Sequence, residues 1–306
     1  MQGGERFNSI GDHLKSVFGR KTVKLSIDAG FTCPNRDGTR GRGGCAFCSG
    51  GGSGELASHT SSSDTDYSAS ITEQIDRLSE KWPDACYLAY FQSFTNTYAP
   101  VDVLRSRYYA ALNDPRISGI AIATRPDCLG DDVLDLLEEI NRDHFMWVEL
   151  GLQSVHNRTL EAMNTCYTYE DYENAASDLI SRGIRVVTHL ILGLPGESQD
   201  MMLESVRKVC SLPVFGIKLH LMNIVRTSPL YRTMPDYVPF DSIGEYVDLA
   251  VRCLEIIPPG VTIHRLTGDV PRKLLVSPEW SYKKRTILNM INSELRIRDT
   301  RQGAAL

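Results

Sequence analysis

Hydrophobic and polar positions divide the chain into short apolar runs and longer amphipathic stretches that follow one another in regular alternation. The apolar runs are rich in β-branched residues or alternate with period two, which is typical of strands. The amphipathic stretches repeat with the spacing of helices. Predicted strands span residues 21–27, 86–91, 117–123, 145–150, 184–192, 216–222 and 261–265, and predicted helices span residues 9–17, 68–81, 101–112, 131–141, 169–182, 201–210, 241–256 and 277–295.

Strands that alternate with helices predict an α/β fold with a parallel sheet. About six strand and helix units precede residue 258, so we expect a partial (open, six-unit) parallel (β/α) barrel with a C-terminal extension rather than a closed barrel of eight units. The expected organisation is an N-terminal helical extension over residues 1–20, the barrel over residues 21–258, and an extension over residues 259–306 that packs on the barrel. In such a barrel, catalytic residues gather at the carboxyl ends of the strands.

Charge is distributed unevenly along a chain whose net charge is −5. Residues 1–50 carry +4 and residues 265–306 carry +5, which leaves −14 for the part between them. Two basic ends on an acidic body suggest an anionic partner, and nucleic acid is the obvious candidate. The alternative is that the basic residues at 283–285 and 296–301 belong to solvated helix faces.

No apolar run approaches the roughly 20 residues of a membrane span, and the first fifteen residues contain no apolar signal core. We therefore expect a cytoplasmic protein with no membrane partner. Eight cysteines in such a chain favour metal or redox chemistry over a disulfide framework. Five of them are scattered and are interpreted mostly as small core residues: Cys86, Cys128, Cys166, Cys210 and Cys253.

The other three cysteines share one loop of glycines, charges and small polar residues. Eleven residues separate Cys33 from Cys45, and two separate Cys45 from Cys48. A loop of this composition buries little apolar area, so a metal centre would be needed to order it. Three ligands leave one metal atom open, whereas closed sites take four. The alternatives are a zinc site completed by His59, or three unrelated free thiols.

An aromatic residue, Phe47, precedes the last cysteine, and this loop resembles the cluster loop of radical S-adenosylmethionine (SAM) enzymes. The long first spacing is similar to that of the Elongator catalytic subunit and its small bacterial relatives. Four further segments of the sequence resemble the same group, namely TRPDCL, ELGLQSVHNRTL, HLILGLPGE and IHRLTGDVPR. The resemblance implies that Cys33, Cys45 and Cys48 hold a [4Fe-4S] cluster whose open iron binds SAM.

The same resemblance implies a cofactor pocket at the strand exits. The Gly-Gly-Glu turn that usually follows the second strand of these enzymes is absent, and polar residues stand in its place. Arg125 and Asp127 either line the site or form a structural ion pair. Glu149 with its neighbours is suited to grip ribose hydroxyls, the alternative being a capped turn. The implied pocket residues are Gln92, Ser93, Thr95, Asn96, Arg125, Asp127, Glu149, Gln153, Ser154, Gly193 and Pro195.

Two titratable residues, Lys218 and His220, lie on one face of the strand at residues 216–222, opposite Ile217 and Leu219. Buried titratable groups are unfavourable unless they are used or paired. They are therefore either substrate contacts and catalytic residues, or a buried pair with an acid such as Glu149.

By resemblance the substrate is tRNA, specifically the C5 side chain of a wobble uridine, and an electron donor of the flavodoxin or ferredoxin type is expected. A base splayed into a barrel mouth needs phosphate contacts at the rim. Candidates for these contacts are Arg36, Arg40, Arg42, Arg272, Lys273, Lys283, Lys284 and Arg285. Two alternatives remain open, a radical SAM enzyme acting on a small molecule or peptide, and a non-catalytic zinc-binding RNA module.

Overall fold

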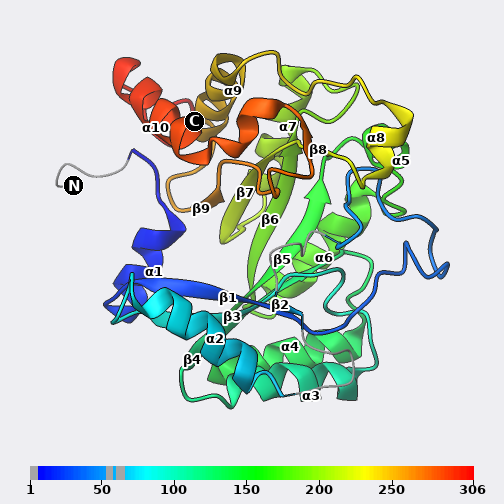
Figure 1. The fold of residues 1–306 in the computed structure, drawn as a ribbon, viewed down its shortest axis with the longest axis vertical. Coiled ribbons are helices and arrows are strands. Elements are labelled where there is room, and N and C mark those ends of the chain that lie inside the picture. Colours follow the sequence, from blue (N-terminus) through cyan, green and yellow to red (C-terminus); the bar gives the residue numbers. More distant parts are fainter. Residues whose placement is uncertain (1–5, 53–57, 60–65) are drawn as a thin grey trace.

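A parallel sheet forms the centre of the computed structural model, which describes residues 6–52, 58–59 and 66–306 (Figure 1). Its strand order is β2-β1-β3-β4-β5-β6-β7-β9, and every neighbouring pair is parallel. The strands are β1 (Thr22–Asp28), β2 (Ser58–His59), β3 (Cys86–Phe91), β4 (Ile117–Thr124), β5 (Phe145–Gln153), β6 (Arg185–Leu192), β7 (Gly216–Leu221) and β9 (Thr262–Arg265). The predicted open, partial (β/α) barrel is thereby confirmed.

Helices cover the outer face of this curled sheet and connect its strands (Figure 1). The described helices are α1 (Ile10–Phe18), α2 (Ser68–Ser79), α3 (Val101–Leu112), α4 (Asp131–Asp143), α5 (Asn157–Ala162), α6 (Tyr169–Ser181), α7 (Gln199–Cys210), α8 (Pro229–Thr233), α9 (Ile243–Glu255) and α10 (Lys284–Ile297). Among the described helices, none combines the length and the apolar composition that a bilayer span requires. Gly130 occupies the N-cap of α4, and Asp131 lies in the first turn of this helix.

The C-terminal part differs locally from the expected long helix over residues 277–295. β10 (Leu275–Ser277) pairs antiparallel with β8 (Ile224–Val225), and a 3-10 turn (Glu279–Tyr282) precedes α10. Pro278 explains why Ser277 is not helical, because the residue before a proline is disfavoured in the α region. The buried side chains of α10 are Ile287, Ile291 and Leu295, and this helix packs against α9.

The two ends of the described chain are joined at the β9 edge of the sheet. The backbone of Ser9 forms a parallel bridge with Ile263. The Gln302 side chain accepts a hydrogen bond from the backbone N–H of Asn8 at 2.8 Å and donates to the carbonyl oxygen of Val261 at 2.8 Å. Residues from both ends therefore cover this edge strand.

The inner face of the sheet changes character along the strands. A small cluster that includes Leu88, Ala121, Trp147 and Val187 fills one part of the interior with apolar side chains. Beyond it, the inward positions of several strands carry charged or polar side chains. Because side chains alternate between the two faces of a strand, these residues meet inside the barrel.

Candidate active site

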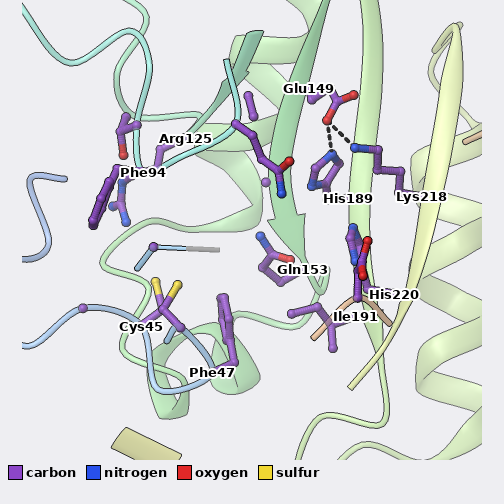
Figure 2. Close-up of a pocket in the computed structure, with 18 of the residues that line it drawn as sticks. Cys45, Phe47, Phe94, Arg125, Glu149, Gln153, His189, Ile191, Lys218 and His220 are labelled. Carbon is purple, nitrogen blue, oxygen red and sulfur yellow. Dashed lines mark hydrogen bonds and ion pairs between the residues drawn. The ribbon is translucent and has the colours of Figure 1, made fainter. Parts of the chain in front are cut away.

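A cavity of about 240 Å³ extends from the cysteine loop into the barrel interior (Figure 2). Its wall is made by the cysteine loop, the inward residues of the strands and the segment after β9. Ten predicted site residues line it: Cys33, Cys45, Cys48, Gln92, Thr95, Arg125, Glu149, Gln153, Lys218 and His220. The structure thus brings the three cysteines and the buried strand residues to one space.

The cysteine loop is held in place by backbone hydrogen bonds on both sides of Ala46. Its N–H donates to the carbonyl oxygen of Met163 at 2.8 Å, and its own carbonyl accepts from the N–H of Leu230 at 2.8 Å. Phe47 packs with Ala46 against a small apolar cluster that includes Leu194 and Met222. The loop thus has a defined backbone path even though its composition is polar.

Cys45 and Cys48 lie close enough to perturb each other. Their mutual hydrogen bond, and then burial, raise the pKa of Cys45 well above its ordinary value. The same hydrogen bond lowers the pKa of Cys48, against the effect of burial and with help from the Arg36 guanidinium. This pair therefore carries a thiolate more readily than two isolated thiols would.

Within the described residues, no three His, Cys, Asp or Glu side chains converge as ligands of one metal ion. Zinc draws its ligands to a single point, whereas a cluster takes its thiolates on separate irons. Cys33, Cys45 and Cys48 line one cavity, and three thiol donors are the set that would hold a cluster with one open iron. The side chain of His59, the ligand considered for zinc, lies outside the described residues.

Arg125 and Asp127 combine the two roles considered for them. The buried Arg125 guanidinium donates to both Asp127 carboxylate oxygens, at 2.9 and 2.8 Å, and to the carbonyl oxygen of Thr165 at 2.8 Å. It also lies 4.9 Å from the ring centroid of Tyr167. Arg125 lines the cavity, whereas Asp127 does not contribute to its wall. The ion pair thus orients the arginine toward the site.

The polar residues that follow β3 fall into two groups, those that line the cavity and those that are buried outside its wall. Gln92 and Thr95 line the cavity. Asn96 is buried away from it and donates from Nδ2 to the carbonyl oxygens of Phe91, at 3.1 Å, and Ala123, at 2.8 Å, so it ties the ends of β3 and β4 together. Ser93 is also buried outside the wall, and its Oγ has no hydrogen-bond partner among the described residues.

The exits of β5 and β6 place fewer of the predicted residues in the cavity. Gln153 lines it and adopts a φ of 73°, while the Ser154 hydroxyl donates to Glu197 and accepts from the N–H of His156 at 3.1 Å. These Ser154 contacts are those of a capped turn. Gly193 has a φ of 92°, and a Cβ there would lie 2.6 Å from the Phe240 ring. Neither Gly193 nor Pro195 lines the cavity.

Glu149 is the hub of a hydrogen-bond network at the inner end of the cavity (Figure 2). Its carboxylate accepts from the Tyr90 hydroxyl at 2.6 Å, from Trp147 Nε1 at 3.0 Å and from His189 Nε2 at 3.0 Å. It also forms ion pairs with Lys218 and, at 3.5 Å, with Lys24. Lys218 is therefore paired with the acid proposed for it, and it lines the cavity as well.

This network keeps a charge deep in the barrel. Burial by itself would raise the pKa of Glu149, but Lys218 and Lys24 outweigh burial and hold that pKa well below its usual range. Burial, and then the positive charge of Lys218, lower the pKa of His189 to about 4. Burial also holds the pKa of His220 well below its ordinary value. At neutral pH, the inner end of the cavity thus contains a carboxylate anion and neutral imidazoles.

The lowered histidine pKa values predict acid lability. In the unfolded chain the imidazole of a histidine binds a proton near pH 6.5, whereas His189 in the folded protein has a pKa of about 4. The contribution of His189 to the free energy of unfolding is therefore complete above pH 6.5 and is lost as the pH falls from 6.5 toward 4. For His189 alone the expected loss is about 3 kcal/mol. Urea unfolding of cluster-free protein at a series of pH values measures it. In His189→Gln the decline should be shallower, and a profile identical to that of the unchanged chain would contradict the assignment.

Sequence reasoning missed several residues of this site. Tyr90 and His189 lie inside runs that were interpreted as apolar strands, and Arg265 ends a short strand of the C-terminal extension. All three line the cavity. The alternation of side chains along a strand could have revealed them, because a polar residue at an inward position of a buried strand needs a partner.

The comparisons with known proteins assign the chain to a family. Residues 35–209 match the model of the Radical SAM superfamily, and residues 214–297 match that of the Radical SAM C-terminal domain. The chain therefore belongs to the radical SAM superfamily and is a radical SAM enzyme. The cofactors of this superfamily are a [4Fe-4S] cluster and SAM.

Similar proteins place it within a smaller group of Elongator-like proteins. It is 44% identical over 300 residues to the uncharacterized protein YtqA of Bacillus subtilis, covering 98% of this chain and 92% of that protein. It is 38% identical over 283 residues to protein YhcC of Escherichia coli K12, covering 92% and 89%. A tRNA uridine(34) acetyltransferase of Methanocaldococcus jannaschii is 26% identical over 166 residues, which are 53% of this chain and 30% of that protein.

A solved structure supports the fold. Elp3 of Methanocaldococcus infernus, lacking its N-terminal residues 1–46, aligns with a TM-score of 0.68 at 16% identity. The alignment covers 92% of this chain and 64% of that chain. The chain thus spans about two thirds of the Elp3 structure and about a third of the related acetyltransferase.

Proposed function

We propose that this radical SAM enzyme modifies tRNA, at the C5 side chain of a wobble uridine. The observation that carries the proposal is the shared cavity, in which three cysteines at the mouth face a buried polar network at the inner end. When bound, the cluster supplies one electron that cleaves SAM to methionine and a 5′-deoxyadenosyl radical, which removes hydrogen from an unreactive C–H group. Partial likeness to a tRNA uridine(34) acetyltransferase supports the choice of substrate.

Cys33, Cys45 and Cys48 would hold the cluster, and the cavity residues at the strand exits would hold SAM. Gln92 and Thr95 stand where the Gly-Gly-Glu turn is missing, and Gln153 offers an amide that both donates and accepts. Arg125 places a permanent positive charge in the wall, suited to a carboxylate. The remaining predicted residues of this set do not line the cavity: Ser93, Asn96, Asp127, Ser154, Gly193 and Pro195.

The inner end would receive the part of the substrate that reacts. Nε2 of His220 is buried with no hydrogen-bond partner among the described residues, and the same is true of Oδ1 of Asn223. Both residues line the cavity. Because unpaired buried polar atoms are unfavourable, a bound group with its own donors and acceptors would satisfy them. His220 is therefore proposed as a substrate contact, and Lys218 is proposed with it because it lines the same part of the cavity, although its Nζ is already bonded to Tyr90 and Glu149.

Some of the basic residues predicted for the rim make structural contacts. Arg36 donates to the carbonyl oxygens of Gly50, at 3.0 Å, and Ser49, at 2.5 Å, and Lys284 pairs with Asp269. Arg272 lies over the exposed ring of Tyr282 at 4.4 Å, two residues beyond Val270 of the cavity wall. Basic side chains beside an exposed aromatic ring are suited to a single-stranded RNA loop.

The direct test is product analysis under anaerobic conditions. Reconstituted protein is incubated with SAM, a reductant and tRNA from cells that lack the protein, and the digested nucleosides are analysed by mass spectrometry. We expect tRNA-dependent deoxyadenosine formation and a mass change confined to the wobble uridine. SAM cleavage with no change in any nucleoside would reject tRNA and favour the second candidate, a small molecule or peptide. Bound zinc without SAM cleavage would favour the third, a non-catalytic RNA module.

Binding of tRNA should depend strongly on salt, because neutralising phosphates releases counterions. Replacing Arg272, Lys273 or Arg285 by serine should each lower the slope of log K against log salt by about 1. Filter binding between low and moderate salt measures this slope. Lys208→Ser is the matched control, since Lys208 pairs with Glu204 on the acidic body of the molecule. If all four substitutions changed this slope equally, the proposal that tRNA binds at Arg272, Lys273 and Arg285 would be rejected.

A further inference from the structure

Asn35 is completely buried inside the otherwise polar cysteine loop. Its side-chain nitrogen Nδ2 lies 2.5 Å from the carbonyl oxygen of Asn164 and 3.5 Å from Sγ of Cys45. Its oxygen Oδ1 lies 3.3 Å from Sγ of Cys166. All three groups that the amide can bond are thus within reach, and one of them is a predicted cluster ligand.

The contacts fix which end of the amide faces the cysteine. The carbonyl oxygen of Asn164 can only accept, so the NH₂ group must be the end that points to it. The second hydrogen of that NH₂ group is then directed at Cys45, and Oδ1 accepts from the thiol of Cys166. Asn35 therefore donates an N–H to the sulfur of Cys45.

The loop closes tightly around this amide. A Cβ at Gly41 would lie 2.2 Å from Oδ1 of Asn35 and 2.7 Å from Sγ of Cys166, so only glycine fits there. Asn164 anchors the same loop independently, because its own Nδ2 donates to the carbonyl oxygens of Arg42, at 3.2 Å, and Gly44, at 2.9 Å. Two neighbouring asparagines thus have separable roles, one directed at a sulfur and one directed at the loop backbone.

We propose that Asn35 is a positioning residue that orients the Cys45 thiolate and raises the reduction potential of the cluster. An N–H···S hydrogen bond stabilises the more negative, reduced cluster, and such bonds are among the factors that set cluster potentials. The inference rests on superfamily membership for the presence of the cluster and is independent of the substrate. It adds a role for a residue outside the predicted site.

The test is the midpoint potential of the cluster, followed by EPR during a redox titration of the reconstituted protein. Asn35→Ala should shift the potential to more negative values. Asn164→Gly is the matched control, because glycine tolerates the φ of 52° found at this position and keeps the backbone carbonyl that accepts from Asn35. The substitution removes the side-chain bonds to the loop backbone and a 3.8 Å contact with the Cys166 thiol. Its potential should equal that of the unchanged chain. An unchanged potential in Asn35→Ala, or the same shift in both variants, would overturn the proposal.

A second measurement covers the case in which Asn35→Ala binds no cluster. Pulsed EPR of the reduced, unchanged protein containing ¹⁵N-labelled asparagine should show a ¹⁵N coupling to the cluster. The coupling should persist in Asn164→Gly, which excludes Asn164 as its source. If the coupling is absent, Asn35 is not bonded to a cluster ligand and the inference fails.

Discussion

Cys45→Ala is expected to abolish deoxyadenosine formation and to lower the iron content, because Cys45 is the central member of the three cysteines that line the cavity. It is buried, and it is also the cysteine that contacts both Cys48 and Asn35. Without it, two thiolates remain, too few to hold a cluster that depends on three protein ligands. Incubation with SAM and dithionite, followed by quantification of deoxyadenosine, should give the level of a protein-free control.

The matched control for this substitution is Cys210→Ala. Cys210 ends α7, and burial raises the pKa of its thiol to about 12, as expected for a structural cysteine. This variant should retain the iron content and the SAM cleavage of the unchanged chain. If Cys45→Ala cleaves SAM as well as Cys210→Ala does, the assignment of the cluster to this loop is wrong.

Glu149→Gln is expected to destabilise the protein by about 3–5 kcal/mol, the usual effect of breaking a buried ion pair. The glutamine has nearly the same shape but no charge, so Lys218 would remain buried without its counter-ion. The glutamine NH₂ group would also face one of the N–H or O–H donors that now bond the carboxylate, from Tyr90, Trp147 or His189. Urea unfolding at pH 7 measures the change.

Glu138→Gln provides the comparison at the surface. Glu138 forms an ion pair with Arg182 at 3.0 Å but its side chain is 42% exposed. Exposed ion pairs contribute little because water screens them, so this variant should unfold close to the unchanged chain. Similar stabilities of the two glutamine variants would show that the Glu149 network is no more important for folding than a surface pair.

The strand and helix pattern was predictable because local periodicity decides it. Strand β3 and helix α3 have the predicted boundaries, and the inward parity of Lys218 and His220 follows from the alternation of side chains. The short elements β8 and β10 were missed, because a pairing between segments fifty residues apart leaves no local periodicity. Sequence reasoning could place polar residues at strand ends but could not decide which of them turn toward the cavity.

Which of these polar side chains face the cavity depends on their tertiary neighbours. Asn96 and Ser154 have the same chemistry as residues that bind ligands, yet their contacts tie strand ends and cap a turn. Asn35 belongs to no recognisable motif, and its orientation toward Cys45 depends on Asn164 and Cys166, which lie about 130 residues away in the sequence and contact its side chain. The three cysteines were identifiable because their spacing alone indicates a shared centre.

The joined ends at β9 have a consequence for how molecules of this protein meet. An uncovered edge strand offers free N–H and C=O groups that recruit strands from other chains and so lead to aggregation. Here the segment at Asn8 and Ser9 already occupies that position beside Ile263, and Gln302 secures it. Self-association by strand addition at this side of the barrel would first require the N-terminal segment to detach.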